Sequence, residues 1–453
     1  MINRRNLLQS LSAGSLAALA PLALHAATTN RVVVVGGGMA GAAVAKYLRL
    51  WSNKTVDVTI VESSTQYVSN IMSNLVVTGQ YAASMLNFNW ANLTRNHGVK
   101  VVAGTVAAIV AGGSLGRWRV TITNGSTTST RYCERVVLAP GVMFDAVPSM
   151  ADATTPAPIL HAWQAGPQTT RLRDQLAAMP ATGTFVMTIP KAPYRCPPGP
   201  YERACVVADY LLRNKPGARV LVLDANPDIM AEKENFSRAF STLYSGNLSY
   251  LPGRVVRAVD AQVGLAGGAV RVDVVVRDAN GVDLVMGSET HTAQVLNVIP
   301  PHRAGRIVQT LGLADATGFA PVDGRSFEST VAGRGGMHVI GDSAKTTLPK
   351  AGHVGNQEGK ICADAILRAF ASQLPYATPT ANSACFSPVS STQASWLTAV
   401  YQYKQDATTG TWRYVAMDQV SGATGATEAQ AFTSGQFSKM TTWYRSLMAE
   451  TFS

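Results

Sequence analysis

The sequence contains little charge, few aromatic residues and no cysteine motif for a metal or a haem. Of its 453 residues, 14% are charged and 7% are aromatic, and the five cysteines include no C-x-x-C or C-x-x-C-H spacing. A thioredoxin-type pair and a covalent c-type haem are therefore excluded on this chain, and no metal site is predicted. Basic runs and motifs that read RNA or DNA are also absent. The formal net charge of +11 thus indicates a diffuse surface field, suited to an acidic protein partner and not to nucleic acid.

The N-terminal segment is too interrupted to predict a stable membrane span. Its apolar stretch, which ends at Leu24, contains Ser, Gln, Gly and Pro. The twin arginines Arg4 and Arg5 precede this stretch, and Leu24-His25-Ala26 offers a small-residue cleavage site. We therefore predict a twin-arginine signal peptide over residues 1–26 and a periplasmic protein exported by that route. A chance Arg-Arg pair in a general secretory signal would change the route but not the compartment.

A glycine-rich turn follows the first strongly apolar run of the mature chain. Val32-Val-Val-Val35 predicts a buried parallel strand, and Gly36, Gly38 and Gly41 follow with the spacing of a dinucleotide-binding turn. The helix after this turn would present its N-terminus to a pyrophosphate. A second predicted strand ends in Glu62, about 20 residues beyond the last glycine, where a carboxylate meets ribose hydroxyls. We predict a dinucleotide site here; the alternative is a glycine-rich turn in an ordinary α/β protein.

A second α/β unit has the same order of strand, helix and strand but lacks the glycines of the first turn. A strand over 184–189, a helix over 201–212 and a strand ending in Asp224 have the right order. The connection after Ile189, however, is rich in proline, which lacks the N–H donors that a pyrophosphate needs. We therefore predict that this unit does not bind NAD(P).

The order of these segments predicts an α/β protein with two Rossmann-like nucleotide-binding domains and a C-terminal α+β domain. A hydrophobic content of 47% allows a sizeable core. The turn Ala139-Pro140-Gly141 is where the chain would leave the first domain, and a later predicted strand, Met337-His-Val-Ile-Gly341-Asp342, ends in Gly-Asp. The predicted ranges are 31–150 and 291–370 for the two parts of the first domain, 151–290 for the central domain and 371–453 for the C-terminal domain.

Three segments resemble one family of the disulfide-reductase-like FAD/NAD(P) oxidoreductases, whose fold is like that of glutathione reductase. They are Ala192-Pro-Tyr-Arg-Cys-Pro-Pro-Gly-Pro-Tyr-Glu-Arg-Ala204, Asn297-Val-Ile-Pro-Pro-His-Arg-Ala-Gly305 and the tail around Trp443. They are similar to the flavoprotein subunit of flavocytochrome c sulfide dehydrogenase. The resemblance spans about residues 31 to 453 and implies an enzyme that binds FAD, oxidises sulfide at the flavin and passes electrons to a c-type cytochrome subunit, a separate chain.

The resemblance also implies roles for individual residues. The three glycines and Glu62 would hold the ADP half of FAD, and Asp342 would bind the ribityl chain. Gly355 lies at the start of a helix whose N-terminus would face the pyrimidine edge, and Trp443 would lie near the flavin ring. Gly141 completes the predicted cofactor-binding set. Cys196 would correspond to one member of a redox-active cysteine pair.

The sequence departs from the family pattern at two positions. Asn70 stands where the family often tethers FAD through a cysteine, so we expect noncovalent FAD. Ala344 stands where the second redox cysteine of the family is expected, which places the ordinary dithiol relay in doubt.

Three roles for Cys196 therefore stay open. It acts alone at the flavin, it pairs with Cys205 or Cys362, or it is structural and the substrate reduces the flavin directly. The neighbouring Arg195 would lower the pKa of Cys196 and favour its thiolate. The two remaining cysteines, Cys133 and Cys385, are expected to lie outside the site.

His353 is the candidate proton shuttle of this site, the alternative being a surface histidine. The predicted function is periplasmic oxidation of sulfide or a related small sulfur substrate by an FAD enzyme with a cytochrome partner. Two alternatives are an FAD oxidoreductase of different substrate that lacks the redox disulfide, and a non-catalytic FAD-binding subunit of a sulfur-oxidising complex.

Overall fold

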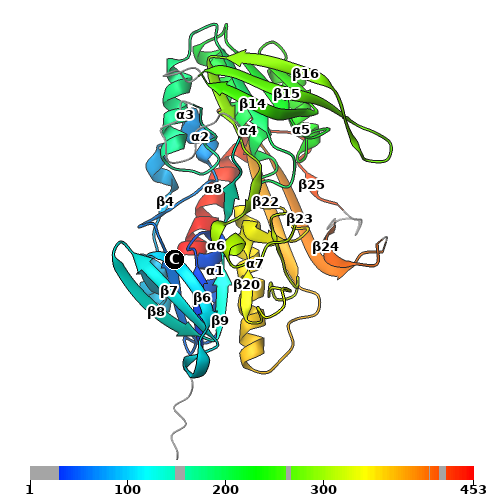
Figure 1. Cartoon of the computed structure of the whole chain (residues 1–453). Coiled ribbons are helices and arrows are strands. Elements are labelled where there is room, and N and C mark those ends of the chain that lie inside the picture. The colour runs from blue at the N-terminus through cyan, green and yellow to red at the C-terminus, as the bar shows by residue number, and fades with distance from the viewer. Residues whose placement is uncertain (1–29, 148–158, 262–266, 408, 418–424) are drawn as a thin grey trace, which may run out of the picture.

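The computed structural model describes residues 30–147, 159–261, 267–407, 409–417 and 425–453. The predicted signal peptide over residues 1–26 lies outside these ranges. The chain forms an α/β structure in which a lower body holds the first and last parts of the sequence and an upper lobe holds the middle (Figure 1). The predicted fold class is confirmed.

A five-stranded parallel sheet forms the centre of the first domain. Its strand order is β20-β9-β1-β2-β5. The strands are β1 (Arg31–Val35), β2 (Asp57–Glu62), β5 (Lys100–Ala103), β9 (Arg135–Leu138) and β20 (Met337–Val339). Because β20 comes from far along the sequence and pairs with β9, the first and second parts of this domain share one sheet. The carboxyl ends of β1, β2, β9 and β20 consequently meet at one edge, where open α/β sheets bind ligands.

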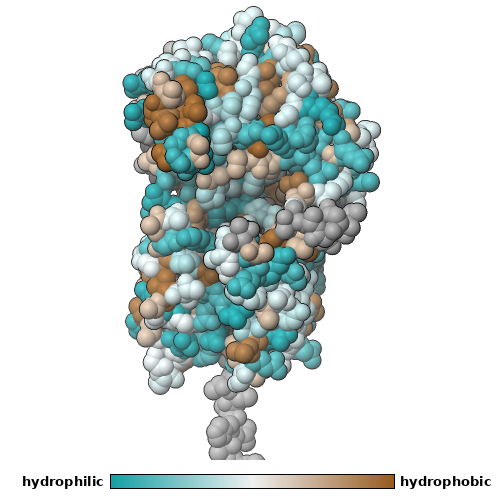
Figure 2. All heavy atoms as spheres, turned by 90° about the vertical axis from the view of Figure 1, so that its right-hand side faces the viewer, coloured by the Kyte–Doolittle hydropathy of each residue, from teal (hydrophilic) through white to brown (hydrophobic). Residues whose placement is uncertain are grey.

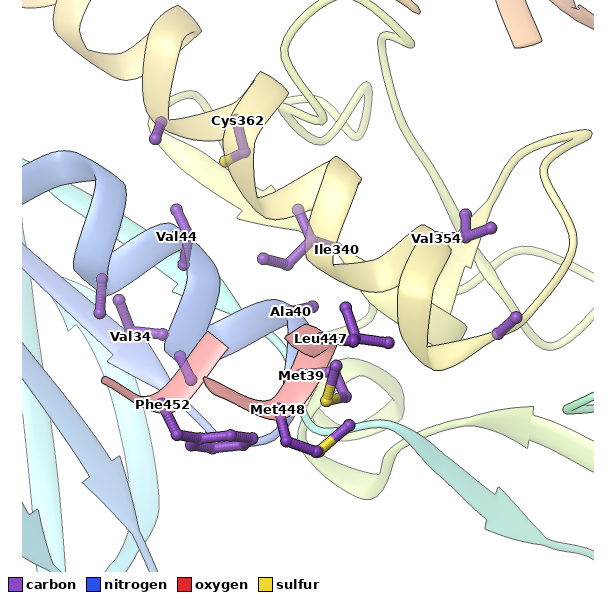
Figure 3. Packing of buried hydrophobic residues seen from close by; sticks show 14 of the residues in the cluster. Val34, Met39, Ala40, Val44, Ile340, Val354, Cys362, Leu447, Met448 and Phe452 are labelled. Carbon is purple, nitrogen blue, oxygen red and sulfur yellow. The ribbon is translucent and has the colours of Figure 1, made fainter. Parts of the chain in front are cut away.

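Two long helices cover one face of this sheet. Helix α1 (Met39–Trp51) packs on α7 (Gly352–Phe370), and a Cβ on Gly359 would lie 2.7 Å from the Ala40 carbonyl oxygen. The absence of a side chain at Gly359 thus lets the two helix backbones approach closely. Figure 3 shows the resulting apolar cluster, in which side chains of α1 and α7 meet Leu447, Met448 and Phe452 of α8 (Ser434–Phe452).

Smaller elements complete the lower body. An antiparallel sheet and several short segments lie around the parallel sheet. They are β6 (Thr105–Ala111), β7 (Trp118–Asn124), β8 (Thr127–Cys133), β3 (Tyr67–Val68), β4 (Asn87–Phe88), α6 (Arg306–Thr310), β19 (Ala320–Pro321) and β21 (Ala344–Lys345). The short helix α2 (Ser73–Val77) instead lies against the upper lobe (Figure 1).

The upper lobe contains a second parallel sheet with the order β13-β12-β11-β17. Its strands are β11 (Thr184–Ile189), β12 (Arg219–Asp224), β13 (Leu248–Pro252) and β17 (Val295–Val298). Helices α3 (Pro167–Ala178), α4 (Gly199–Asn214) and α5 (Lys233–Arg238) accompany it, as does an antiparallel sheet of β14 (Arg254–Ala261), β15 (Gly268–Arg277) and β16 (Asp283–Ala293). The antiparallel pair β10 (Val142–Phe144) and β18 (His302–Ala304) lies where the chain passes between the two parts.

The C-terminal region contacts both the lower body and the upper lobe. Strands β22 (Thr380–Pro388), β23 (Ala394–Gln405) and β24 (Trp412–Met417) form an antiparallel sheet, and β25 (Thr427–Glu428) pairs with β23. Figure 2 shows a recess between the upper and lower parts of one face of the molecule, with apolar patches on the upper part. None of the helices in the described ranges has the length and apolar composition needed to span a bilayer.

Candidate functional site

A cavity of about 720 Å³ lies between the two nucleotide-type domains and the C-terminal region. Its lower wall is the carboxyl edge of the five-stranded sheet, and its opposite walls come from the loop before α4, from β22 and from α8. Its size is within the range of small-molecule and cofactor sites. Every residue proposed from the sequence for the site lines this cavity except Gly41, which lies just behind it: Gly36, Gly38, Glu62, Asn70, Gly141, Cys196, Asp342, His353, Gly355 and Trp443.

The turn between β1 and α1 forms one end of the cavity, and it has no space for a side chain at Gly36 or Gly41. Gly36 has a φ of +96°, and a Cβ there would overlap the Ala139 carbonyl oxygen. A Cβ on Gly41 would overlap the carbonyl oxygen of Gly36. Helix α1 begins directly after Gly38 without a side-chain cap, so its first N–H groups are available to an anionic ligand.

Glu62 lies at the end of β2, beside this turn. Its carboxylate accepts a hydrogen bond from the Gly37 N–H at 2.8 Å and one from the Ser64 N–H at 3.0 Å. Trp90 supports the same turn, because its indole N–H donates to the Gly37 carbonyl at 2.8 Å. The acid is therefore held in a fixed position at the cavity wall, as a ribose-binding carboxylate requires.

Asp342 follows β20 and forms an ion pair that joins the two walls of the cavity. The Arg195 Nε lies 2.6 Å from the Asp342 carboxylate, and both side chains are largely buried. Gly141 borders this ion pair, since a Cβ on it would lie 3.0 Å from Arg195 Nη2. No local sequence pattern predicts this pairing, which links the loop before α4 to the edge of the first sheet.

Helix α7 presents its N-terminus at the other end of the cavity. It begins at Gly352 with no side-chain cap and no acidic residue in its first turn, and Gly355 lines the cavity. Lys350, just before the helix, donates from Nζ to the carbonyl oxygens of Asp342 at 2.8 Å and Ala344 at 3.0 Å. The uncapped helix start and the nearby cation favour negative charge on a bound group.

Asn70 and Trp443 complete the walls. The Asn70 side-chain oxygen accepts a hydrogen bond from the Ala165 N–H at 2.7 Å, which ties the first domain to the segment before α3. Trp443 comes from α8 and packs against Phe386, with ring centroids 5.5 Å apart. An aromatic surface from the C-terminal region thus faces the cavity.

His353 lies in the first turn of α7, edge-on to Trp443 with ring centroids 6.2 Å apart. Its Nδ1 accepts a hydrogen bond from the Ala384 N–H at 3.0 Å, so the neutral ring carries its proton on Nε2. Burial lowers the pKa of His353, and the ring is therefore neutral at pH 7.

Cys196 has a left-handed backbone conformation with a φ of +58°. Its N–H donates to the Lys350 carbonyl at 2.7 Å, and its carbonyl accepts from the Gly199 N–H at 2.9 Å. The Trp163 indole N–H donates to the Arg195 carbonyl at 3.0 Å and fixes the same loop. A side chain at Gly199 would collide with the thiol, because a Cβ there would lie 2.8 Å from Sγ.

The expectation that Arg195 favours the Cys196 thiolate is wrong. Burial raises the pKa of Cys196 well above its usual value, and the Glu202 carboxylate raises it further. Arg195 directs its guanidinium to Asp342, and its charge is neutralised there. Cys196 is therefore a thiol at neutral pH, next to the buried Glu202, whose pKa burial raises to about 8.

The structure also corrects the assignment of the other cysteines. Cys205 and Cys362 are fully buried in two different apolar clusters and do not line the cavity, although Cys196 packs against the cluster that contains Cys205. Cys385, expected outside the site, lies in its wall on β22. Cys133 is buried in a cluster of the first domain, away from the cavity.

The described residues of the upper lobe differ from the first domain at the end of the second strand, where an acid is held by the chain itself. Asp224, at the end of β12, accepts hydrogen bonds from the hydroxyls of Tyr201 at 2.8 Å and Tyr250 at 2.9 Å. Its second oxygen accepts from the backbone and side chain of Asn226 at 2.8 and 2.7 Å. The carboxylate that a nicotinamide ribose would need is thus fully occupied by the chain itself. Among the described residues, no group of three or more His, Cys, Asp or Glu side chains is arranged to hold a metal ion.

Solved structures with the same fold include several oxidoreductases. The sulfide:quinone oxidoreductase of Aquifex aeolicus matches with a TM-score of 0.69 and 13% identity, over 93% of this chain and 91% of that one. An NAD-dependent persulfide reductase from A. fulgidus matches with a TM-score of 0.58 and 14% identity, over 93% and 77% of the two chains. At these identities the likeness shows the fold alone.

Sequence comparisons define the family. Residues 30–162 match the pyridine nucleotide-disulphide oxidoreductase model, and residues 169–300 match the central region of the sulfide dehydrogenase [flavocytochrome c] flavoprotein chain. The sulfide dehydrogenase flavoprotein chain of Chlorobaculum thiosulfatiphilum is 52% identical over 48 residues, which are 11% of this chain and 98% of that sequence. The chain is therefore an FAD-dependent oxidoreductase that belongs to the family of flavocytochrome c sulfide dehydrogenase flavoprotein chains.

Proposed function

We propose that this chain is an exported FAD enzyme that oxidises sulfide or a related reduced sulfur compound and passes the electrons to a c-type cytochrome on a separate chain. The observation that carries the proposal is that Cys196 shares one cavity with the glycine turn after β1. One end of the cavity is suited to a dinucleotide, and a wall carries a sulfur side chain. The match to the sulfide dehydrogenase flavoprotein chain covers the Cys196 loop and supports a sulfur substrate.

The residues of the cavity fit FAD. The glycine turn and the uncapped start of α1 would hold the pyrophosphate, and Glu62 would bind the ribose. Asp342 would meet the ribityl chain, while the N-terminus of α7 would stabilise negative charge at the pyrimidine edge. FAD, when bound, accepts two electrons and releases them singly. With Asn70 in place of a thiol, we propose that the cofactor is held noncovalently.

Two groups in the cavity hold protons at neutral pH. The Nε2 of His353 carries one, because Nδ1 accepts the Ala384 hydrogen bond. Glu202 carries another, since burial raises its pKa to about 8. Both side chains line the cavity, and we propose that one of them exchanges a proton with a sulfur substrate bound there.

The proposed electron acceptor is a c-type cytochrome, and nicotinamide dinucleotides are not proposed as partners. The chain has no C-x-x-C-H motif, so a c-type haem must reside on another chain. A net charge of +11 favours an acidic partner surface. Because Asp224 is occupied internally, we propose that nicotinamide dinucleotides do not exchange electrons with this enzyme. The twin arginines Arg4 and Arg5 support export to the periplasm.

Rapid mixing of the purified holoprotein with sulfide tests the function. Sulfide should bleach the flavin absorbance within milliseconds to seconds, and an added c-type cytochrome should then become reduced. Cys196→Ala should retain FAD but lose the bleaching, whereas Cys133→Ala, a change in the remote core, should behave as wild type. Acid precipitation should release the flavin into the supernatant if it is noncovalent; flavin in the pellet would contradict that part.

A second candidate is an FAD oxidoreductase of different substrate, favoured by Ala344 in place of the expected thiol. A flavin that sulfide leaves oxidised, but that another donor reduces, would select this function. A flavin that no donor reduces would select a non-catalytic FAD-binding subunit.

A further inference from the structure

Two of the five cysteines face the same cavity. All five are free thiols in this structure, and only Cys196 and Cys385 line the cavity. Cys196 lies in the loop before α4, whereas Cys385 lies within β22 of the C-terminal sheet. The fold therefore brings two distant thiols to one solvent-accessible space.

One short turn fixes both thiol-bearing segments. The N–H of Cys196 donates to the Lys350 carbonyl at 2.7 Å, and the N–H of Ala384, next to Cys385, donates to His353 Nδ1 at 3.0 Å. Lys350 and His353 are three positions apart at the start of α7. The two thiols thus extend from segments held on the same turn, and movement of that turn would carry both.

Helix α4 begins three residues after Cys196 and packs against β22, which carries Cys385, so the two thiols reach the cavity from adjoining segments. Burial raises the pKa of both thiols, and the Glu202 carboxylate raises the pKa of both further. Burial disfavours two thiolates here, and a disulfide would replace both titrating groups with a neutral bond.

We propose that Cys385 is the second redox cysteine of this cavity and that it forms a reversible disulfide with Cys196. When the bond closes, two S–H bonds break, one S–S bond forms, two protons leave, and two electrons pass to the FAD that the proposed function supplies. The inference therefore rests on that function for its electron acceptor. It also accounts for Ala344, because the fold supplies a second thiol from β22.

Peptide mapping of the wild-type holoprotein tests the pair directly. The oxidised protein is denatured, its free thiols are alkylated without reductant, and the digest is analysed by mass spectrometry. A linked pair of peptides containing Cys196 and Cys385 is expected, with the other three cysteines alkylated. Prior reduction with dithiothreitol should convert the pair into two alkylated peptides. Alkylation of both residues in the oxidised holoprotein would overturn the inference.

The Cys385→Ser variant gives an independent readout. In its oxidised holoprotein Cys196 should become alkylated, and sulfide-driven bleaching should slow by about 100-fold or more, the scale on which loss of a positioned group slows a chemical step. Cys133→Ser is the matched control and should keep both the linkage and the rate. If Cys385→Ser does not fold, the smaller Cys385→Ala and the wild-type mapping decide the question.

The outcomes separate this inference from the proposed function. Rapid bleaching of the wild-type flavin by sulfide without a linkage between Cys196 and Cys385 overturns the pair and leaves the function intact. A linkage with a flavin that sulfide does not reduce overturns the function and leaves the pair.

Discussion

The turn between β1 and α1 leaves no room for a side chain at Gly41, and the Gly41→Ala variant should therefore bind FAD weakly. The added Cβ would overlap the Gly36 carbonyl oxygen and lie 3.0 Å from the Gly36 carbonyl carbon. Ordinary contacts of this kind begin near 3.4 Å, so the strand-to-helix turn must open. Forcing a methyl group into packed surroundings costs about 1–3 kcal/mol. If that strain is relieved when the turn moves away from the pyrophosphate, the FAD dissociation constant rises by about 5- to 150-fold.

Titration of the apoprotein with FAD, followed by quenching of flavin fluorescence, measures this change. Thermal unfolding of the apoprotein should accompany the titration, because a general loss of stability would lower the melting temperature without cofactor. The change at Gly41 is expected to affect the melting temperature of the holoprotein more than that of the apoprotein.

Gly246→Ala is the matched control. This glycine has open space around it and is remote from the cavity, so its variant should bind FAD as the wild type does. An unchanged dissociation constant in Gly41→Ala, within twofold of wild type, would refute the steric argument for this turn.

Three further predictions concern other parts of the chain. Arg203→Met should lower the free energy of unfolding in urea by about 3–5 kcal/mol, because it leaves the buried Ala162 carbonyl and the side-chain oxygens of Asn74 and Asn297 without a donor; a loss under about 1 kcal/mol would contradict this. Burial raises the pKa of Glu232 to about 8, so the protonated side chain contributes stability that is fully present below its unfolded pKa and is lost as the pH rises toward 8. The urea midpoint of Glu232→Gln should therefore match that of the wild type at pH 5 and exceed it at pH 8. Equal midpoints at pH 8 would show that this carboxyl does not titrate as stated. NADH mixed anaerobically with the holoprotein should leave the flavin spectrum oxidised, and rapid bleaching would show that the upper lobe still binds a nicotinamide.

Local sequence patterns predicted the end of the cavity that is built from consecutive residues. The glycine turn and Glu62 follow strands whose β-branched residues specify burial, and the turn has an almost fixed geometry. The same holds for Asp342, which lies three residues after the end of a short buried strand. The order of strand, turn and helix along the chain fixes the positions of these residues, so they could be predicted without knowledge of contacts between distant segments.

The opposite walls depend on contacts between distant segments. Cys385 reaches the cavity because β22 packs beside α7, a relation that no local pattern of residues specifies. Arg195 was expected to act on its neighbour Cys196, but its side chain crosses to Asp342. A backbone with a φ of +58° at Cys196 turns the thiol and the guanidinium in different directions, and adjacency in sequence therefore gave the wrong electrostatic partner.

The internal hydrogen bonds of Asp224 set a limit on redesign of the upper lobe. Restoring a glycine-rich loop after β11 would supply donors for a pyrophosphate, but the adjacent acid would still be occupied by Tyr201, Tyr250 and Asn226. A variant meant to accept reducing equivalents from NADH must therefore replace both phenols as well. Coenzyme use by this lobe would therefore require coordinated changes on three separate elements, namely the loop after β11, α4 and β13.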